Sequence, residues 1–490
     1  MAFSQLKDPS LVKQLAYIDG AWQKADSGRT FAVTNPATGE RLADVPDMGV
    51  AETRRAIEAA NAAFKTWRAK TAKERAGLLR KWFDLIMANQ EDLARLMTIE
   101  QGKPLTESRG EIAYGAAFIE WYAEEAKRIY GDVIPSTMPN KRMLVLKQPI
   151  GVVGTITPWN FPNAMITRKC APAIAAGCTV VIKPAEETPL SALALAELAE
   201  RAGIPKGVIN IITTLDAPAV GVELTTNPLV RKFSFTGSTP VGKLLMQQCA
   251  STVKKVSLEL GGNAPFIVFD DADVDAAVVG AIASKFRNAG QTCVCANRIY
   301  VQAGIYDEFA KRFAQAVAAL KVGNGLEDGV AIGPLINDDA VAKVERILAD
   351  AKAKGAQIAT GGEKAPTAGS LFFQPTVLTG VTDNMVMAQE EIFGPLAPLY
   401  RFETEQEICA RANGVPFGLA AYFYTRDIGR VWRVSEELEF GIVSINEGIF
   451  STEVAPFGGV KESGIGREGS KYGVDDFIEI KYVLHGGLGT

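Results

Sequence analysis

The sequence predicts an α/β protein with two doubly wound parallel sheets. After about residue 145, short runs of β-branched residues alternate with helical stretches rich in alanine and leucine. This alternation is typical of parallel strands joined by crossover helices. The chain also has 490 residues, which is more than one hydrophobic core normally organises, so we expect more than one domain.

The helices and strands are expected in a definite order. Alanine, glutamate, arginine and leucine dominate residues 51–100, and apolar residues recur there at helical spacing, so this region is helical up to Gly102 and Pro104. The first alternating unit has strands at residues 150–156, 179–182, 208–212 and 232–235, and helices at 171–176, 191–201 and 241–250. The second unit has strands at residues 266–269, 299–301 and 441–445, and helices at 273–286 and 306–320. The units meet near residues 259–263, and ligands of open α/β sheets tend to bind in such a cleft.

Composition and charge exclude several classes of protein. The net charge is −4 and no basic block occurs, so nucleic acid is not expected as a partner. No apolar run reaches the ~18 residues that span a bilayer, and the N-terminus lacks a signal-peptide pattern, so we expect a cytoplasmic protein without a membrane partner. The six cysteines of so long a chain do not form a disulfide framework.

The histidine content restricts the chemistry. His485 is the only histidine, so a Ser-His-Asp or Cys-His site would have to take its base from the far C-terminal segment. A histidine-rich metal site is excluded, and Cys293 and Cys295 have no second cysteine pair at zinc-ribbon spacing, so no metal is expected. A catalytic cysteine in this chain would need a carboxylate as its base.

Cys293 is the candidate nucleophile. It follows residues 288–292, a polar and flexible stretch typical of a functional loop. Arg287 and Arg298 would lower its pKa by favouring the thiolate. The alternative is a buried cysteine that packs as a small hydrophobic residue, which is the usual role of a free cysteine.

Residues 233–243 predict a strand, a turn and the start of a helix. Gly237 through Lys243 match the beginning of a P-loop, but Leu244 stands where a Mg²⁺-binding serine or threonine is required. What remains is a helix N-terminus whose N–H groups face an anion such as a dinucleotide pyrophosphate. The Rossmann pattern Gly-x-Gly-x-x-Gly does not occur after a strand.

Two further residues are candidates for catalysis. Glu259 precedes a glycine pair at a strand end, and apolar neighbours indicate partial burial, which would raise its pKa towards that of a general base. A solvated turn glutamate is the alternative. Asn160 lies between two aromatic residues and two prolines, on a rigid loop where its amide N–H suits an oxyanion site. Alternatively, Trp159 and Phe161 only fill a domain interface.

Together these segments resemble the aldehyde dehydrogenase superfamily over nearly the whole chain. The segments that carry the resemblance occur in the family's order: Pro158-Trp159-Asn160-Phe161-Pro162, Lys183-Pro184-Ala185-Glu186, Phe235-Thr236-Gly237-Ser238, Glu259-Leu260-Gly261-Gly262, Gly290-Gln291-Thr292-Cys293, Glu391-Ile392-Phe393-Gly394-Pro395 and Pro456-Phe457-Gly458-Gly459. The resemblance implies that Cys293 attacks an aldehyde, that Asn160 and the Cys293 N–H hold the oxyanion, and that hydride passes to a nicotinamide ring. Glu259 then activates the water that hydrolyses the thioester.

The resemblance also implies a dinucleotide site. Lys183 and Glu186 would lie at the adenosine ribose, Ser238 at the pyrophosphate, and Glu391 and Phe393 at the nicotinamide ribose. The remaining cofactor-binding residues are Thr157, Pro158, Trp159 and Gly237. Because a carboxylate binds ribose hydroxyls and repels a 2′-phosphate, Glu186 predicts NAD rather than NADP.

Within the superfamily the chain most resembles the succinate-semialdehyde dehydrogenases. That likeness implies that Arg168, Arg287 and Ser451 bind the distal carboxylate of the substrate, which suits guanidinium groups. Either arginine could instead form a structural ion pair. Glutarate semialdehyde or 2-oxoglutarate semialdehyde would fit the same arginines, and a P-loop-like hydrolase or a non-catalytic nucleotide-binding protein is a remote alternative. Cys295 is either a redox switch that forms a disulfide with Cys293 or a spare small residue.

The expected domains follow from the same resemblance. Residues 1–126 and 149–259 would form the NAD-binding domain, and residues 260–472 the catalytic domain. Residues 127–148 and 473–490 would form a small β segment for oligomerisation. We therefore expect a homodimer or homotetramer that acts on a small carboxylated aldehyde.

Overall fold

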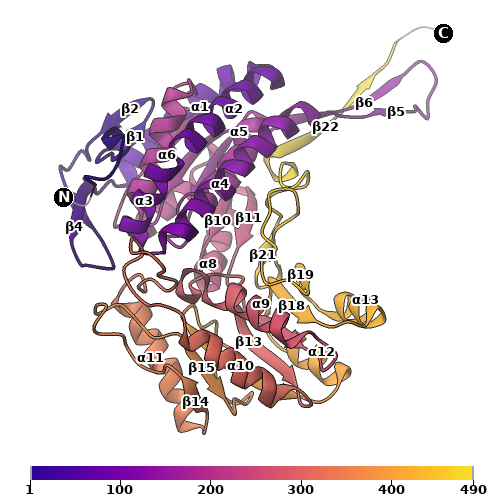
Figure 1. Ribbon diagram of the computed structural model, residues 1–490. Helices are drawn as coiled ribbons and strands as arrows, with labels where there is room; N and C mark the ends of the chain where they lie inside the picture. Colours follow the sequence, from indigo (N-terminus) through magenta and orange to yellow (C-terminus); the bar gives the residue numbers. More distant parts are fainter. Residues whose placement is uncertain (1–2, 488–490) are drawn as a thin grey trace.

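Two parallel sheets with helices packed on them form the two α/β units that the sequence predicts (Figure 1). The computed structural model describes residues 3–487. Residues 1–2 of the predicted NAD-binding domain and 488–490 of the predicted oligomerisation segment lie outside the described residues. The predicted fold class is confirmed, and the domain boundaries stay predictions.

The first sheet has eight strands in the order β2-β1-β9-β8-β7-β10-β11-β21. The strands from β9 to β11 run parallel, whereas β1, β2 and β21 pair antiparallel at the edges. In chain order the strands are β1 (Ala16–Ile18), β2 (Ala21–Gln23), β7 (Val152–Ile156), β8 (Thr179–Lys183), β9 (Ile209–Ile211), β10 (Val230–Thr236), β11 (Lys255–Glu259) and β21 (Gly464–Ile465). The four strands predicted for this unit are β7 to β10.

Helices of the first unit pack on both faces of this sheet. They are α1 (Val50–Ala69), α2 (Ala72–Ala88), α3 (Gln90–Gln101), α4 (Leu105–Glu125), α5 (Ala164–Ala176), α6 (Pro189–Arg201), α7 (Ala217–Thr226) and α8 (Thr239–Cys249). The long helical region predicted before Gly102 is three helices, because Thr71 caps α2 through the Glu74 N–H and Gly102, at φ 98°, ends α3. Among residues 3–487, no helix is long and apolar enough to cross a membrane.

Strand β8 explains why both faces need helices. Val180 and Ile182 pack in one hydrophobic cluster with α5 and α6, whereas Val181 packs in another with α1 and α7. Successive side chains of a strand point to opposite faces, so a continuous apolar run requires apolar partners on both sides. This is the pattern from which the sequence predicts a parallel sheet.

The second sheet is also largely parallel, in the order β14-β15-β16-β13-β12-β18-β19. Its strands are β12 (Ala264–Val268), β13 (Ala296–Gln302), β14 (Gln357–Thr360), β15 (Thr376–Thr379), β16 (Leu396–Phe402), β18 (Ala420–Tyr424) and β19 (Ile442–Ile445). Its helices are α9 (Val274–Phe286), α10 (Tyr306–Ala318), α11 (Asp338–Ala353), α12 (Glu405–Asn413) and α13 (Ile428–Glu437). Only β14 runs antiparallel in this sheet.

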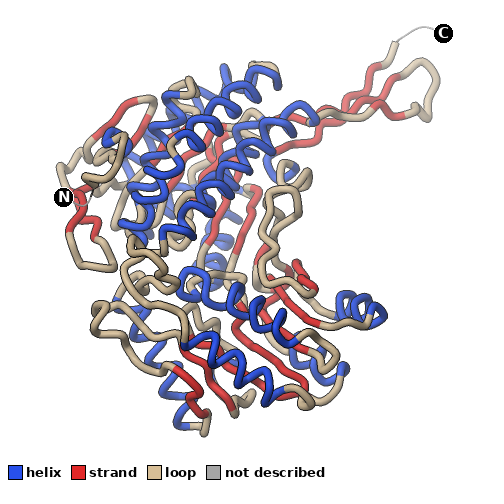
Figure 2. Tube along the Cα trace, in the orientation of Figure 1, coloured by secondary structure: helices blue, strands red, loops and turns tan. Residues whose placement is uncertain are grey.

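A three-stranded antiparallel sheet projects from the body of the molecule (Figures 1 and 2). It joins β5 (Val133–Ile134), β6 (Arg142–Pro149) and β22 (Ile478–His485), and so brings together two segments far apart in the sequence. Elsewhere β3 (Thr30–Thr34) pairs with β4 (Arg41–Pro46), and β17 (Phe417–Gly418) with β20 (Val460–Lys461). The projecting sheet lies where the sequence predicts the β segment for oligomerisation.

The candidate site lies between strand ends of the two large sheets. Asn160 follows β7, and Glu259 ends β11, so both lie at the carboxyl edge of the first sheet. Cys293 precedes β13, and therefore lies at the amino edge of the second sheet. Ligands of parallel sheets bind outside the carboxyl ends of the strands, and here the second unit closes that space.

Candidate active site

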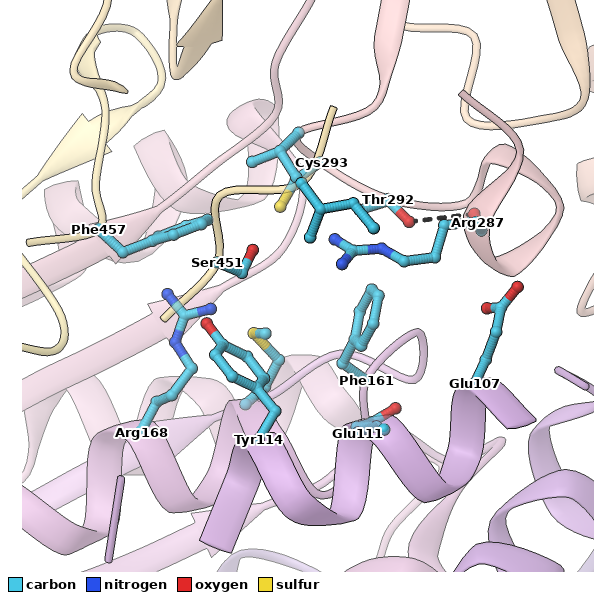
Figure 3. Close-up of a pocket in the computed structure, with 14 residues that line it drawn as sticks. Glu107, Glu111, Tyr114, Phe161, Arg168, Arg287, Thr292, Cys293, Ser451 and Phe457 are labelled. Atoms are coloured by element: carbon cyan, nitrogen blue, oxygen red, sulfur yellow. Dashed lines mark hydrogen bonds between the residues drawn. The ribbon is translucent and has the colours of Figure 1, made fainter. Parts of the chain in front are cut away.

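Cys293 lies between two cavities. It lines one of about 270 Å³, which also contains Arg168, Arg287 and Ser451 (Figure 3). It also lines a second cavity of about 290 Å³, which contains Asn160. A thiol in this position can react with a molecule held in the first cavity while another is held in the second.

Burial controls the acidity of Cys293. Burial, followed by the charges of Glu259 and Glu391, raises the pKa of its thiol to about 12, although Arg168 and Arg287 act in the opposite direction. The expectation of a lowered pKa is therefore wrong. Arg298 was expected to assist, but its guanidinium donates to the main-chain carbonyls of Asn263, Arg411 and Ala412 and so serves the packing of the second unit.

Glu259 ends β11 and is buried, as the apolar neighbours indicated. Its Oε2 has no hydrogen-bond partner among the described residues. Burial, followed by the charge of Glu468, raises the pKa of Glu259 to about 8. The glycine pair after it allows close approach to the nucleophile, because a Cβ at Gly262 would lie 2.4 Å from the carbonyl oxygen of Cys293. A carboxyl group with this acidity is suited to general-base chemistry near neutral pH.

The Asn160 side chain lies at the second cavity, in the loop after β7. Its Nδ2 donates to the Gln291 carbonyl at 3.0 Å, while its Oδ1 has no partner among the described residues. Because an amide nitrogen carries two hydrogens, this bond leaves one N–H for a ligand. Asn160 and the loop of Cys293 are thus joined directly.

The first cavity contains two arginines in different surroundings. Arg168 forms an ion pair with Glu468 at 2.7 Å and stacks over the Phe457 ring at 4.1 Å. Arg287 stacks over the Phe161 ring at 5.3 Å, and the ion pairs of the described residues do not involve it. Figure 3 shows both guanidinium groups and the Ser451 hydroxyl reaching into the space below the Cys293 sulfur.

Sequence reasoning missed several residues around this cavity. Helix α4 contributes Glu107, Glu111 and Tyr114 to its wall. Glu468 binds both Arg168 and Lys169; burial alone would raise its pKa, but these two cations reverse the effect, so its pKa is lowered. Nothing in the local sequence marks the burial of Glu468.

The second cavity and the strand ends beside it suit a dinucleotide. Trp159 and Phe393 pack edge to face at 5.7 Å in its wall, where Pro158, Gly237, Ser238 and Glu391 also lie. The hydroxyls of Thr157 and Thr236 are buried and have no partner within residues 3–487, and the N-terminus of α8 follows Ser238 directly. Burial raises the pKa of Glu391 to about 7, and its carboxylate accepts from the Gly262 N–H at 3.1 Å. The described residues therefore offer hydroxyl, carboxylate and N–H groups to a ribose and an anion.

Lys183 and Glu186 lie outside the lining of this cavity. Lys183 ends β8 and its carbonyl accepts from the Thr157 N–H at 3.1 Å, so it neighbours the predicted cofactor residues. Its Nζ pairs with the Glu186 carboxylate at 2.7 Å. Glu186 is partly exposed and presents a negative charge beside this strand end.

Cys295 faces the protein interior rather than a cavity. Its Sγ donates to the Gly290 carbonyl at 3.2 Å, and the Lys285 Nζ approaches the same sulfur at 3.6 Å. A disulfide with Cys293 would require Cys295 to leave both contacts, and the redox switch stays a prediction. Within residues 3–487, no cluster of three or more His, Cys, Asp or Glu side chains is arranged to hold a metal ion.

Comparisons with known proteins give a consistent result. A profile of the aldehyde dehydrogenase family matches residues 22–483. The chain is 64% identical over 484 residues to the glutarate-semialdehyde dehydrogenase of Pseudomonas aeruginosa strain PAO1, with 99% of this chain and 100% of the relative covered. It is 64% identical over 482 residues to the NADP(+) succinate-semialdehyde dehydrogenase GabD of Escherichia coli K12, with 98% and 100% covered. A crystal structure of succinate-semialdehyde dehydrogenase from Burkholderia pseudomallei superposes with a TM-score of 0.98 at 63% identity, covering 99% of this chain and 100% of that one.

Proposed function

Because this chain belongs to the aldehyde dehydrogenase family, we propose that it oxidises succinate semialdehyde to succinate with a nicotinamide dinucleotide. The observation that carries the proposal is the position of Cys293 between two cavities, one with two arginines and the other with hydroxyl and carboxylate groups. A bound dinucleotide would supply the hydride acceptor. Pro158, Trp159, Ser238, Glu391 and Phe393 would hold it.

Cys293 and Asn160 would carry out the first half of the reaction. The Cys293 sulfur attacks the aldehyde carbon and gives a thiohemiacetal, while the thiol proton passes to the Glu259 carboxylate, whose Oε2 has no partner in the described part of the chain. The carbonyl oxygen becomes negative, and the free N–H of the Asn160 amide and the Cys293 backbone N–H stabilise it. Loss of hydride leaves a thioester on Cys293.

Glu259 would control the second half. The proton that Glu259 accepted from the thiol first leaves to solvent. With a pKa of about 8, about a tenth of Glu259 is carboxylate at pH 7 and about half at pH 8, and this carboxylate takes a proton from water. The water oxygen attacks the thioester carbon, the C–S bond breaks, and the sulfur takes from Glu259 the proton that Glu259 removed from water. The acid leaves and Cys293 is regenerated.

The first cavity favours a short carboxylated aldehyde. Arg168, Arg287 and Ser451 offer guanidinium and hydroxyl donors to a carboxylate. The cavity volume of about 270 Å³ is at the lower limit of small-molecule sites, which favours succinate semialdehyde over its longer homologues. Glutarate semialdehyde is the second candidate, because the relative from P. aeruginosa carries that name.

The cofactor proposal is NAD rather than NADP. Glu186 holds the Lys183 ammonium at 2.7 Å, so that cation is already neutralised and a 2′-phosphate would meet the Glu186 carboxylate. The relative GabD is named for NADP(+) at 64% identity, so overall similarity favours NADP and the NAD proposal is supported by the charge of Glu186 alone.

The projecting sheet supports a homodimer or homotetramer. Val133, Ile480 and Tyr482 expose more than half of their surface on β5 and β22. Exposed apolar side chains on a projecting sheet are typical of a surface covered by another protein chain. Sedimentation of the purified protein would measure the number of copies.

A panel of aldehydes would test the function. Formation of reduced nicotinamide is followed with succinate, glutarate and 2-oxoglutarate semialdehydes and with uncharged butanal, each with NAD and with NADP. The highest kcat/KM is expected for succinate semialdehyde with NAD. Cys293→Ala should abolish every oxidation while dinucleotide binding, measured by fluorescence, persists. Equal kcat/KM for butanal and succinate semialdehyde would contradict the substrate proposal.

A further inference from the structure

The turn before Cys293 has an unusual backbone. Asn288 (φ 51°, ψ 39°), Ala289 (φ 55°, ψ 31°) and Gly290 (φ 77°) are consecutive and all left-handed. This region is disfavoured for residues with a Cβ; asparagine tolerates it better than alanine does. Neighbouring groups must therefore hold this turn in place.

Asn288 supplies most of the bonds that hold it. Its backbone N–H donates to Glu107 Oε2 at 2.8 Å, and its Oδ1 accepts from Gln101 Nε2 at 3.1 Å. Both partners come from the α3–α4 region of the first unit, whereas Asn288 belongs to the second. Asn288 is 2% exposed, and its bond with Gln101 is buried, whereas its bond with Glu107 is partly buried. The turn is thereby tied to the opposite unit.

The remaining donors of Asn288 reach the two sides of the proposed oxyanion site. Its Nδ2 donates to the Asn160 carbonyl at 3.1 Å and, at 3.4 Å, to the Gln291 carbonyl. The Gln291 carbonyl is also the acceptor that fixes the Asn160 amide. The Asn288 side chain therefore holds the main chain of Asn160, the proposed oxyanion donor. It also holds the Gln291 carbonyl, which orients the Asn160 amide and lies two residues before Cys293.

We propose that Asn288 is the positioning residue that holds the Asn160 amide at a fixed distance and angle from Cys293. The inference rests on the proposed function, because it assigns the Asn160 amide to the oxyanion. Asn288 itself touches neither cavity among the described residues, so it acts through Asn160 and Gln291. Without its Nδ2, both carbonyls lose a donor. The Asn160 carbonyl then keeps only the Lys103 Nζ at 2.6 Å, and the Asn160 amide is held by a Gln291 carbonyl that is itself less restrained.

Two substitutions of Asn288 separate positioning from folding. Asn288→Asp keeps the size, the acceptor for Gln101 and the backbone N–H, but places an oxygen against two carbonyl oxygens. Asn288→Gly tolerates the left-handed backbone and removes all side-chain bonds. The matched control is Ala289→Gly, which lies in the same turn with the same backbone and no polar side chain; its kcat should stay within about twofold because glycine accepts this backbone.

The expected result is a loss of kcat without a loss of binding. Complete removal of an oxyanion donor costs about 10²–10³-fold in kcat, so a misdirected donor should cost about tenfold or more. KM for the aldehyde and for NAD should stay within about threefold, since the arginines and the cofactor groups are unchanged. A loss confined to variants with a lowered unfolding temperature, or an unchanged kcat, would overturn the inference.

A double-mutant cycle with Asn160→Ala gives the decisive measurement. If Asn288 acts through the Asn160 amide, Asn160→Ala with Asn288→Asp should be no slower than Asn160→Ala alone. Losses that multiply would show that Asn288 acts elsewhere and refute the inference. An active Asn160→Ala would refute the proposed oxyanion role and the inference with it. A slow Asn160→Ala with a normal Asn288→Asp would refute the inference alone.

Discussion

Replacing Arg287 by alanine should lower the kcat/KM for succinate semialdehyde by about 10- to 150-fold, because a hydrogen bond to a charged group contributes about 1.5–3 kcal/mol and each 1.4 kcal/mol is tenfold. The structure gives the reason for choosing this arginine. Its guanidinium lines the cavity over the Phe161 ring and forms no ion pair among residues 3–487, so its charge is available to a carboxylate. The kcat/KM for butanal, which has no carboxylate, should stay within about threefold of the wild-type value, because butanal makes no bond with Arg287.

Arg168→Ala should behave differently. Arg168 pairs with Glu468 at 2.7 Å, and it lowers the pKa of Glu259. Its removal should therefore lower the kcat/KM for succinate semialdehyde. It should also shift the pH dependence of kcat for both aldehydes to higher pH, because the Glu259 carboxylate loses a stabilising cation. Arg287→Ala should leave that pH dependence in place.

Steady-state kinetics of both variants with the two aldehydes provide the assay, and Arg287→Lys is the matched control. The lysine keeps the charge but loses the two-pronged geometry, so its kcat/KM should lie between those of wild type and Arg287→Ala. Equal losses for succinate semialdehyde and butanal in Arg287→Ala would refute carboxylate binding, and would instead assign Arg287 to the folding of the adjacent turn.

Three further predictions concern the base, the cofactor and the second thiol. The pKa of Glu259 is raised to about 8, so its carboxylate fraction and the hydrolysis rate should rise as pH increases through about 8. Glu259→Gln should lose this dependence and about 10²–10⁴-fold in kcat, and single-turnover formation of reduced cofactor should also slow, because Glu259 accepts the Cys293 thiol proton. A pH profile unchanged in Glu259→Gln would exclude Glu259 as the base. Glu186→Ser should raise the ratio of kcat/KM for NADP to that for NAD by at least about tenfold, because like-charge contacts cost several kcal/mol; an unchanged ratio would place cofactor selection elsewhere. Peroxide inactivation that dithiothreitol reverses in wild type but not in Cys295→Ala would support the redox switch, and identical recovery in both would end it.

The sequence predicts the fold class because the strands and helices of a parallel sheet have characteristic local compositions. Strand β8 is a continuous apolar run, and the helices on either side of it in the chain are rich in alanine and leucine. The sequence also singled out Cys293, Glu259 and Asn160, because each belongs to a short motif of loop residues at a strand end. Local patterns of this kind can be recognised in the sequence without knowledge of the contacts between distant residues.

Long-range contacts explain what the sequence could not predict. Lys169 and Glu468 are 299 positions apart and meet only in the folded protein. Helix α4 is buried along much of its length, so its composition does not mark Tyr114 as a cavity residue. The contact between Lys285 and Cys295 likewise depends on how α9 packs beside β13.

The pKa of Cys293 shows most clearly that long-range contacts matter more than sequence neighbours. Counting neighbouring arginines in the sequence predicts a stabilised thiolate, since a nearby cation favours the charged form. In the structure one of those arginines, Arg298, binds main-chain carbonyls, and burial together with Glu259 and Glu391 outweighs the cations that remain. The pKa of about 12 for Cys293 exceeds that of about 8 for Glu259, so the resting thiol keeps its proton and Glu259 is ionised first as pH rises. The same burial that makes the sulfur a weak acid thus makes the carboxylate beside it a usable base, and this pairing follows from packing rather than from residue type.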